Sequence, residues 1–440
     1  MNKDFKKEFT PQCHKYYNTI RKYAERNNLK NTLIALDLAC ELHHGMHRDG
    51  GLPYVIHPLE LTYYLIILNI HDAILEKNLS ELHNADLAYE VTLRELDVLL
   101  ASSLLHDVVE DCKNKLPNKS SNDFVDVYHL DPNVVLFVTI LTKDKSLPGY
   151  SIENYFSQII TYWQTLIIKV IDRACNCSTI DNFAEDRMIK YVKETRKYFY
   201  DMCSTGKMHF PHFSDILTIL KYLLVSICET VSSSLNLKDI IVPVSPEKSY
   251  YFIKGYAVKG NMKNTLISLP LAKSYYKNYT RKTGDPFIIH PLRVASYLIS
   301  LGIDTDKVCS AAVLHEIINT CHLKYNGIEI VTEHHINSEV LELIRLVANA
   351  ERYPLEIYYA ALRECPEAFM LKLSNRAHTC TKLLDSSNEE ITNYICECEQ
   401  YIYPACEYVI EHYPKYANSI LIAHFHIYST CRIVKSLRLK

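Results

Sequence analysis

The stretch "LDVLLASSLLHDVVEDC", from Leu96 to Cys112, decides the fold of the first half of the chain. Its apolar residues recur at helical spacing, yet four ionisable side chains crowd its end. A charge taken into an apolar interior costs on the order of several kcal/mol unless it is paired or bound to a metal. We therefore expect a helix that carries His106, Asp107, Glu110 and Asp111 either to solvent or to a cation.

The composition favours an all-α protein with more than one domain. The chain has 440 residues, of which 48% are hydrophobic, so it can form two or three domains of ordinary size. Glycine is scarce, at 10 residues, and the alternation typical of strands is rare. The net charge is −3 and no basic stripe is present, so we expect no nucleic-acid partner.

The cysteines and the most apolar segment indicate a cytoplasmic location. The 15 cysteines form no CxxC pair, and no secretory signal precedes them, so we expect reduced thiols. The most apolar segment, Ile216 to Val231, includes Lys221 and Glu229 and is short for a bilayer. We interpret it as a core helix and expect no membrane partner.

The chain repeats itself. "IRKYAERNNLKNTLIALDLACELH", from Ile20, is matched by "IKGYAVKGNMKNTLISLPLAKSYY" from Ile253, an offset of 233 residues. "SLLHDVVEDC" is matched by "AVLHEIINTC" at an offset of 209, so the first copy carries about 24 extra residues. We assign these to a polar surface excursion around Glu76–Glu90. The repeat predicts two copies of one helical domain, residues 1–232 and 250–440, joined by a linker at 233–249 and packed together.

Four residues of the first copy form a candidate metal site: His57, His106, Asp107 and Asp172. A lone histidine on an apolar face is more often a core residue than a ligand, and the isolated pair His71–Asp72 shows how little a His-Asp dipeptide means. Two imidazoles and two carboxylates together suit Mn²⁺, Fe²⁺, Zn²⁺ or Mg²⁺. Such a set leaves positions free for water and phosphate oxygens.

The spacing of the neighbouring polar residues supports a cation. Asp107 and Asp111 are four residues apart on the predicted helix. Without a cation between them, the two carboxylates would repel each other by roughly a few tenths of a kcal/mol. Asp172 and Asn176 are also four apart, which places an amide beside the second carboxylate ligand.

Three motifs, "HRDGGLPYVIHPLELTYYL", "LLHDVVEDC" and "IIKVIDRACN", resemble those of the HD-type alarmone hydrolases. These form the hydrolase half of RelA/SpoT-type proteins and their small stand-alone relatives. The resemblance covers most of Leu29–Phe183 and, weakly, Lys263–Leu384, whereas no segment resembles the alarmone synthetase half. It implies an architecture of two tandem HD-domain helical bundles.

The resemblance also implies a reaction, hydrolysis of the 3′-pyrophosphate of ppGpp or pppGpp, a small-molecule nucleotide substrate. It implies that Mn²⁺ is the cofactor and that Glu110 and Asp111 perform general acid–base work. The implied roles of the remaining positions are metal ligands and substrate contacts: His57, His106, Asp107 and Asp172 for the metal, and Arg48, Asn176 and Thr179 for the nucleotide.

The first copy departs from the family at two positions. The family has Arg-Lys where this chain has Arg48-Asp49, and it has an arginine where Ser178 stands. The loss of two positive charges beside a polyanionic substrate leaves the nucleobase open, and an adenine alarmone is an alternative.

The second copy has lost more. Its metal set reads His290, His315, Glu316 and Asn375, and its acidic pair has become Asn319 and Thr320, while Thr379 stands at the place of Asn176 and Arg281-Lys282 keeps the family pair. We expect this copy to be catalytically inactive, either as a nucleotide-binding domain or as a structural partner.

Two other functions remain open at this stage. One is an HD phosphohydrolase that acts on a nucleoside triphosphate or a signalling nucleotide. The other is a non-enzymatic regulator that binds a nucleotide, although such a protein would not need Glu110 and Asp111.

Overall fold

The computed structural model describes residues 3–146, 149–237, 246–281, 284–321, 327–348 and 353–439. Within these ranges the regular elements are helices, and the only β-type pairings are two isolated bridges, His47–Pro53 and Thr280–Pro286. The predicted all-α fold class is therefore confirmed. The chain divides into two compact units, residues 1–224 (unit 1) and 225–440 (unit 2).

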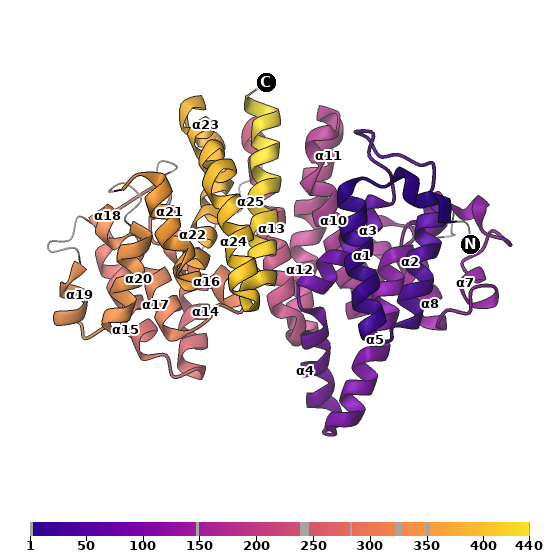
Figure 1. Cartoon of the computed structure of the whole chain (residues 1–440), viewed down its shortest axis with the longest axis horizontal. Helices are drawn as coiled ribbons and strands as arrows, with labels where there is room; N and C mark the ends of the chain where they lie inside the picture. Colours follow the sequence, from indigo (N-terminus) through magenta and orange to yellow (C-terminus); the bar gives the residue numbers. More distant parts are fainter. Residues whose placement is uncertain are drawn as a thin grey trace. The chain divides into compact units, whose positions relative to one another are not determined.

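In unit 1, helix α5 lies at the centre and packs against α2, α3, α4 and α8, while α10 packs against α3 and α8 (Figure 1). The three sequence motifs thus lie on helices that contact one another. The helices are α1 (Pro11–Arg26), α2 (Lys30–Leu42), α3 (Ile56–Ile67), α4 (Ile70–Leu82), α5 (Ala85–Leu105), α6 (Val108–Asp111), α7 (Asp123–Asp126), α8 (Pro132–Leu141), α9 (Ile152–Ile159), α10 (Trp163–Ser178), α11 (Glu185–Glu194), α12 (Tyr200–His209) and the first part of α13 (Ser214–Ser234).

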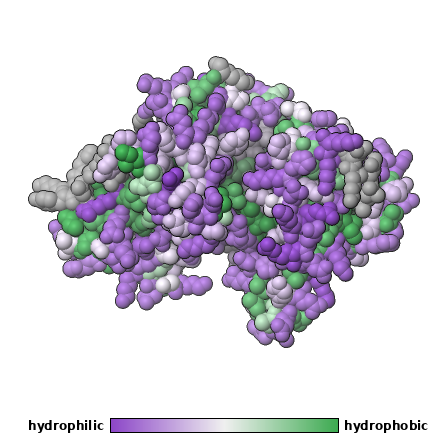
Figure 2. Space-filling view, viewed as in Figure 1, coloured by the Kyte–Doolittle hydropathy of each residue, from purple (hydrophilic) through white to green (hydrophobic). Residues whose placement is uncertain are grey.

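The extra residues of the first copy form a helical hairpin. Helices α4 and α5 run side by side away from the rest of unit 1 and turn at His83–Asn84 (Figure 1). Apolar side chains gather at the tip of this hairpin (Figure 2), where Leu79 and Leu87 are exposed. The polar composition around Glu76–Glu90 predicted a surface excursion, and the structure adds that the excursion is helical because it prolongs α5 toward its N-terminus.

In unit 2, α16 packs against α14, α17 and α22. Helices occupy both ends of the predicted linker 233–249, because α13 extends to Ser234 and α14 begins at Pro246, while 238–245 lie outside the described residues. The helices are α14 (Pro246–Lys259), α15 (Lys263–Tyr275), α16 (Ile289–Ser300), α17 (Asp306–Leu314), α18 (Ile317–Cys321), α19 (Glu329–Thr332), α20 (Ser338–Ala348), α21 (Leu355–Arg363), α22 (Pro366–Thr379), α23 (Asn388–Glu397), α24 (Tyr403–His412) and α25 (Ala417–Arg438).

Contacts recur in both units at the offsets of the sequence repeat. Asp97 on α5 accepts hydrogen bonds from the backbone and side chain of Thr32, each at 2.7 Å, at the start of α2. In unit 2, Asp306 on α17 accepts the same two bonds from Thr265, each at 2.8 Å. Each carboxylate thereby satisfies N–H groups in the first turn of a neighbouring helix that lack partners within their own helix.

A second recurring feature is a π-helical turn of five residues, Thr195–Phe199 in unit 1 and Cys398–Ile402 in unit 2. In both units a buried arginine pairs with the glutamate that ends the preceding helix, as Arg173–Glu194 and Arg376–Glu397.

One helical stretch of the described residues, Pro211–Ser234, is long and apolar enough to cross a membrane by length and composition. However, 67% of its apolar window is buried inside the protein. The ammonium group of Lys221 donates to the carbonyl oxygen of Tyr200 at 2.9 Å, and Glu229 pairs with Lys382 at 3.2 Å. These features are typical of a core helix, which is what the sequence predicts for Ile216–Val231.

Candidate active site

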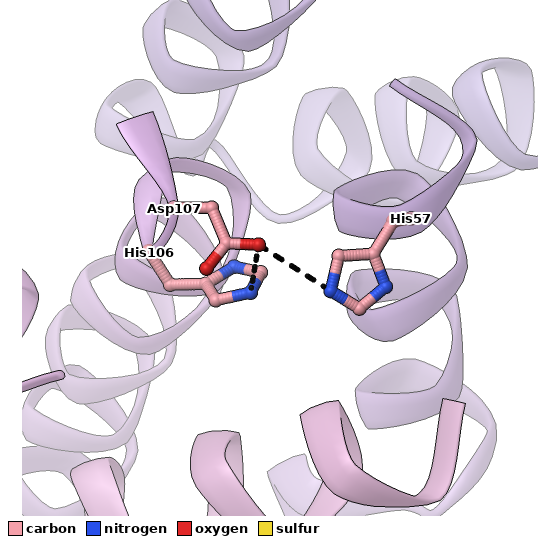
Figure 3. A group of neighbouring side chains, drawn as sticks. All are labelled: His57, His106 and Asp107. Atoms are coloured by element: carbon pink, nitrogen blue, oxygen red, sulfur yellow. Dashed lines mark ion pairs between the residues drawn. The ribbon is translucent and has the colours of Figure 1, made fainter. Parts of the chain in front are cut away.

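Three helices of unit 1 bring the four predicted ligands together. His57 lies in the first turn of α3, His106 and Asp107 link α5 to α6, and Asp172 lies in α10. The Nε2 atom of His57 is 3.1 Å from Asp172 Oδ1 and 3.5 Å from Asp107 Oδ2. The Nε2 atom of His106 is also 3.1 Å from Asp107 Oδ2, and Figure 3 shows both rings directed at this carboxylate.

The helix predicted to run through this motif is interrupted at His106–Asp107. Helix α5 ends at Leu105, and the four-residue α6 begins at Val108. The side chain of His106 contributes to the break, because its Nδ1 lies 2.7 Å from the carbonyl oxygen of Ser103, in the last turn of α5. The bond from the Asp111 N–H to the Asp107 carbonyl, at 2.9 Å, keeps these two side chains on one side of the turn.

The side-chain environment of His106 fits a metal ligand. Its Nδ1 is close enough to the Ser103 carbonyl to donate a hydrogen bond, so Nε2 is the ring nitrogen that faces the site and could bind a cation. This Nε2 is buried and makes no hydrogen bond within the described part of the chain. A divalent cation between the two imidazoles and two carboxylates would satisfy it, so these residues fit the cation that the sequence predicts.

The electrostatics of the site show how strongly the carboxylates depend on nearby positive charge. Burial alone would raise the pKa of Asp172, but Lys169, 2.8 Å away, and His57 hold it well below its ordinary value. Burial would lower the pKa of His106, but Asp107 raises it to about 9. Because a metal-bound imidazole must lose its ligand-side proton, binding of a cation here would release a proton from His106.

The predicted acidic pair lies beside these ligands and is exposed. Asp111 accepts a hydrogen bond from the hydroxyl of Tyr54 at 2.5 Å, and the same hydroxyl is 3.1 Å from Asp107. Glu110 accepts a hydrogen bond from the backbone N–H of Lys143 at 2.5 Å. Partial burial raises the pKa of both carboxyl groups, which brings each closer to the range where it can take up and release a proton.

Both acidic residues line a cavity of about 360 Å³. Its walls carry charges of both signs, with carboxylates toward the metal ligands and several cations around them. Sequence reasoning did not identify most of these cations, and only Lys169 has a local signal, three residues before Asp172. The lining residues are Tyr54, Asp107, Glu110, Asp111, Lys143, Lys169, Asp172, Arg173, Asn176, Arg187, Lys190, Tyr191 and Glu194.

The three residues predicted to bind the nucleotide differ in position. Asn176 lines the cavity, where its amide donates to Asp172 Oδ1 at 2.6 Å and its side-chain oxygen accepts a bond from Arg48 at 2.5 Å. Arg48 therefore reaches the cavity through Asn176. Thr179 caps the end of α10, where its hydroxyl is 3.3 Å from the Asn176 carbonyl, and it is not among the cavity-lining residues.

The residue that replaces the family lysine, Asp49, forms an ion pair with Arg187. Arg187 also stacks over Phe183, with its guanidinium carbon 3.9 Å from the ring centre. Since Arg187 lines the cavity, a positive charge stands close to the position where the sequence comparison found one missing. The sequence gives no local signal for this pairing, because Asp49 and Arg187 are separated by 138 residues.

The corresponding residues of unit 2 partly keep the arrangement. His290, His315 and Glu316 bring one ligand atom each to within 4.8 Å of one another. The amide of Asn375 is 3.4 Å from Glu316 Oε1 and donates to it. Asn319 donates toward the carbonyl of Ala348, at 3.5 Å, and Lys282 lies outside the described residues.

Comparison with known proteins gives a match to one domain family and matches to enzymes named pyrophosphohydrolases and pyrophosphokinases. Residues 268–356, within unit 2, match the HD domain family. A guanosine-3′,5′-bis(diphosphate) 3′-pyrophosphohydrolase of Borreliella burgdorferi is 24% identical over 173 residues, 39% of this chain and 22% of that protein. The protein of the same name from Aquifex aeolicus is 34% identical over 115 residues, 24% of this chain and 16% of that protein.

A GTP pyrophosphokinase of Myxococcus xanthus is 26% identical over 185 residues, 40% of this chain and 21% of that protein. The chain thus spans at most 22% of the length of these three relatives. No solved structure gives a significant match. The HD domain match and the repeated similarity to pyrophosphohydrolases of guanosine bis(diphosphate), each over part of the chain, support an HD-type alarmone hydrolase family.

Proposed function

We propose that unit 1 hydrolyses the 3′-pyrophosphate of a guanosine alarmone such as (p)ppGpp, with Mn²⁺ as the cofactor. The observation that carries this proposal is the convergence of His57, His106, Asp107 and Asp172, because the two aspartates of this group line a cavity that also holds an acidic pair and several cations. The printed names of the relatives support the same reaction class.

The cations of the cavity suit a substrate with several phosphate groups. Lys143, Arg187 and Lys190 line the cavity together with the metal-site carboxylates. Phosphate oxygens would accept charge-assisted hydrogen bonds from these side chains, which are shorter and stronger than bonds between neutral groups. This placement would direct the pyrophosphate toward the ligands and leave the nucleoside near Arg48 and Asn176.

Glu110 and Asp111 supply the proton transfers of the proposed reaction. When bound, a divalent cation would neutralise phosphate charge and lower the pKa of the attacking water. One carboxylate would take the proton from that water, while the other would donate a proton to the leaving oxygen. The hydroxyl of Tyr54 holds Asp111 in place, and the backbone of Lys143 holds Glu110.

An adenine alarmone is the second candidate substrate. Asp49 and Ser178 both depart from the family sequence, and Ser178 is buried with its hydroxyl donating to the Cys175 carbonyl. At the first of these positions, Arg187 brings a cation to Asp49 and also lines the cavity.

For unit 2 we propose that the domain has no hydrolytic activity. Asn319 and Thr320 occupy the positions of the acidic pair and cannot accept a proton from water, and Asn375 supplies an amide in place of the second carboxylate.

The proposal is tested by product analysis. The full chain is incubated with Mn²⁺ and, separately, ppGpp, pppGpp, ppApp, GTP and ATP, and the products are identified by ion-exchange chromatography. We expect pyrophosphate together with the nucleoside 5′-diphosphate from ppGpp or ppApp, or the nucleoside 5′-triphosphate from pppGpp. Release of phosphate or triphosphate from an ordinary nucleotide would contradict this proposal and would indicate a different HD phosphohydrolase activity. Binding without any product would indicate a non-enzymatic regulator.

A further inference from the structure

Unit 2 contains a cluster of metal-ligating side chains that the proposed hydrolysis does not use. His290 lies in the first turn of α16, and His315 and Glu316 link α17 to α18. His315 Nε2 is 3.4 Å from Glu316 Oε1, and His290 Nε2 is 3.8 Å from the same oxygen. Both imidazoles are buried, with 5% of His290 and 1% of His315 exposed.

The hydrogen bonds of His315 leave one nitrogen directed into the cluster. Its Nδ1 lies 2.7 Å from the carbonyl oxygen of Ala312, to which it can only donate. Nε2 is therefore the ring nitrogen that can offer a lone pair to a cation, and this atom is buried without a hydrogen-bond partner in the described part of unit 2. A buried acceptor without a hydrogen bond is destabilising, and a metal ion would satisfy it.

The orientation of His290 is fixed by a histidine that unit 1 lacks. His290 Nδ1 lies 2.7 Å from His378 Nδ1, whereas unit 1 has Cys175 at the position of His378. Two ring nitrogens at this distance hold one proton between them, so one ring donates and the other accepts. When His290 is the donor, its Nε2 carries a lone pair toward Glu316, as metal-bound histidines require.

Asn375 does not complete this cluster as a fourth ligand. Its amide nitrogen donates to Glu316, while its side-chain oxygen accepts a hydrogen bond from the Thr379 hydroxyl at 3.1 Å. The donor set is therefore two imidazole nitrogens and one carboxylate, with a single negative charge. This set suits Zn²⁺ and similar transition metals better than Mg²⁺ or Ca²⁺, which prefer oxygen ligands.

We propose that unit 2 binds one transition-metal ion of the Zn²⁺ class through His290, His315 and Glu316, with His378 as a positioning residue, and that this ion takes no part in hydrolysis. The ion would connect α16 to the α17–α18 junction and thereby stabilise unit 2. The proposal concerns metal binding alone and stands independently of the substrate of unit 1.

The test measures zinc bound by the full chain after the carboxylate ligands of unit 1 have been replaced, in the variant Asp107→Asn/Asp172→Asn. After chelation and equilibrium dialysis against Zn²⁺, the bound metal is counted by atomic emission. We expect about one equivalent with tight binding. Adding Glu316→Gln or His315→Ala should remove it, whereas adding His412→Ala, an exposed histidine on α24, should not.

His378 is tested by affinity and by the visible spectrum of the Co²⁺-loaded chain. His378→Ala should weaken zinc binding about 10–100-fold and alter the cobalt spectrum, because His290 loses the acceptor that sets its tautomer. Circular dichroism of each variant reports folding. A folded baseline variant that retains no zinc, or zinc that survives Glu316→Gln undiminished, would overturn the proposal. If the variant Asp107→Asn/Asp172→Asn fails to fold, Glu316→Gln is introduced into the otherwise unchanged chain, where it should remove one equivalent of bound zinc.

Discussion

At the scale of single residues, the acidic pair and the proposed metal ligands of unit 1 have distinct environments. Asp107 and Asp172 lie among imidazoles, whereas Glu110 and Asp111 are exposed and are held by Lys143 and Tyr54. The two groups should therefore respond differently to substitution.

Glu110→Gln and Asp111→Asn should each reduce the hydrolysis rate by about 10²–10⁴-fold, the usual contribution of general acid–base catalysis. Both replacements keep the side-chain oxygen that accepts the bond from Lys143 or Tyr54, so bound metal and KM should change little. The rates are measured under saturating substrate, with Asp72→Asn in the isolated His71–Asp72 pair as the matched control. Loss of metal from both variants would make these residues ligands instead.

Asp172 should also be important for stability, because it is the partner of Lys169. Both side chains are buried, with 7% of each residue exposed, and their charged atoms are 2.8 Å apart. Removing one member of a buried ion pair leaves the other uncompensated, so Asp172→Ala should cost about 3–5 kcal/mol of unfolding free energy. Urea unfolding measures this loss, and the double variant Asp172→Ala/Lys169→Met should recover most of it. An unchanged urea midpoint in Asp172→Ala would contradict the pairing.

Unit 2 shows the consequence of losing that carboxylate. Lys372 occupies the position of Lys169, but its partner position holds Asn375, and burial lowers the pKa of Lys372 to about 8 from 10.5. Between pH 8 and 10.5 the unfolded chain retains a proton that the folded chain has released, so this lysine makes stability rise with pH.

This pH dependence can be isolated with Lys372→Met. Relative to that variant, the unchanged chain should be least stable near pH 7 and should gain stability as the pH approaches 10. Urea midpoints of both proteins, measured in chelator at several pH values, give the comparison. A difference that stays constant across this range would show that Lys372 titrates normally.

At the scale of secondary-structure elements, the structure repeats one device twice. Asp97 caps α2 and Asp306 caps α15, each through a neighbouring helix rather than through local sequence. Hydrogen bonds to a charged acceptor contribute about 1.5–3 kcal/mol, so Asp97→Ala and Asp306→Ala should each destabilise one helix start.

Hydrogen exchange locates the effect of these two variants. Asp97→Ala should speed exchange in the first turn of α2 and leave α15 protected, while Asp306→Ala should do the reverse. Each variant thus serves as the control of the other. Equal loss of protection in both helices would show that the two caps are not local features.

The helices themselves were predictable from the sequence, whereas their ends were not. Helical spacing of apolar residues indicated α5, but the break at His106 depends on a side-chain bond to the Ser103 carbonyl that periodicity cannot show. The polar stretch around Glu76–Glu90 indicated exposure, yet its helical form follows from the packing of α4 against α5.

At the scale of the whole molecule, the sequence motifs indicated the four predicted metal ligands, whereas other residues of the cavity became visible only through long-range contacts. The four ligands were recognisable because each lies in a motif with its own local pattern. Lys143 and Arg187 were not, because they reach the cavity from segments that lie outside these motifs. Their contribution depends on the folded chain alone.

The two units should be unequal in activity. The variant Asp107→Asn/Asp172→Asn leaves unit 2 unchanged and places an asparagine beside Lys169, a pairing that unit 2 already contains at Lys372 and Asn375. Steady-state assays with the alarmone should show a loss of orders of magnitude, because the carboxylate ligands of unit 1 are gone. Activity comparable with the unchanged chain would assign the reaction to unit 2.

The π-helical turn at Thr195–Phe199 sets the rotation of the helix that follows it. Such a turn amounts to one extra residue within a helix, and one residue corresponds to about 100° of rotation about the helix axis. The turn therefore decides which side of α12 meets α10, where a Cβ on Gly206 would come within 2.5 Å of Leu166. A single-residue deletion here would rotate a larger side chain into that contact. The α4–α5 hairpin extends away from unit 1 and can differ in length without changing the core. The helical segment around Thr195–Phe199 cannot lose a residue in the same way, because Gly206 would leave its contact with Leu166.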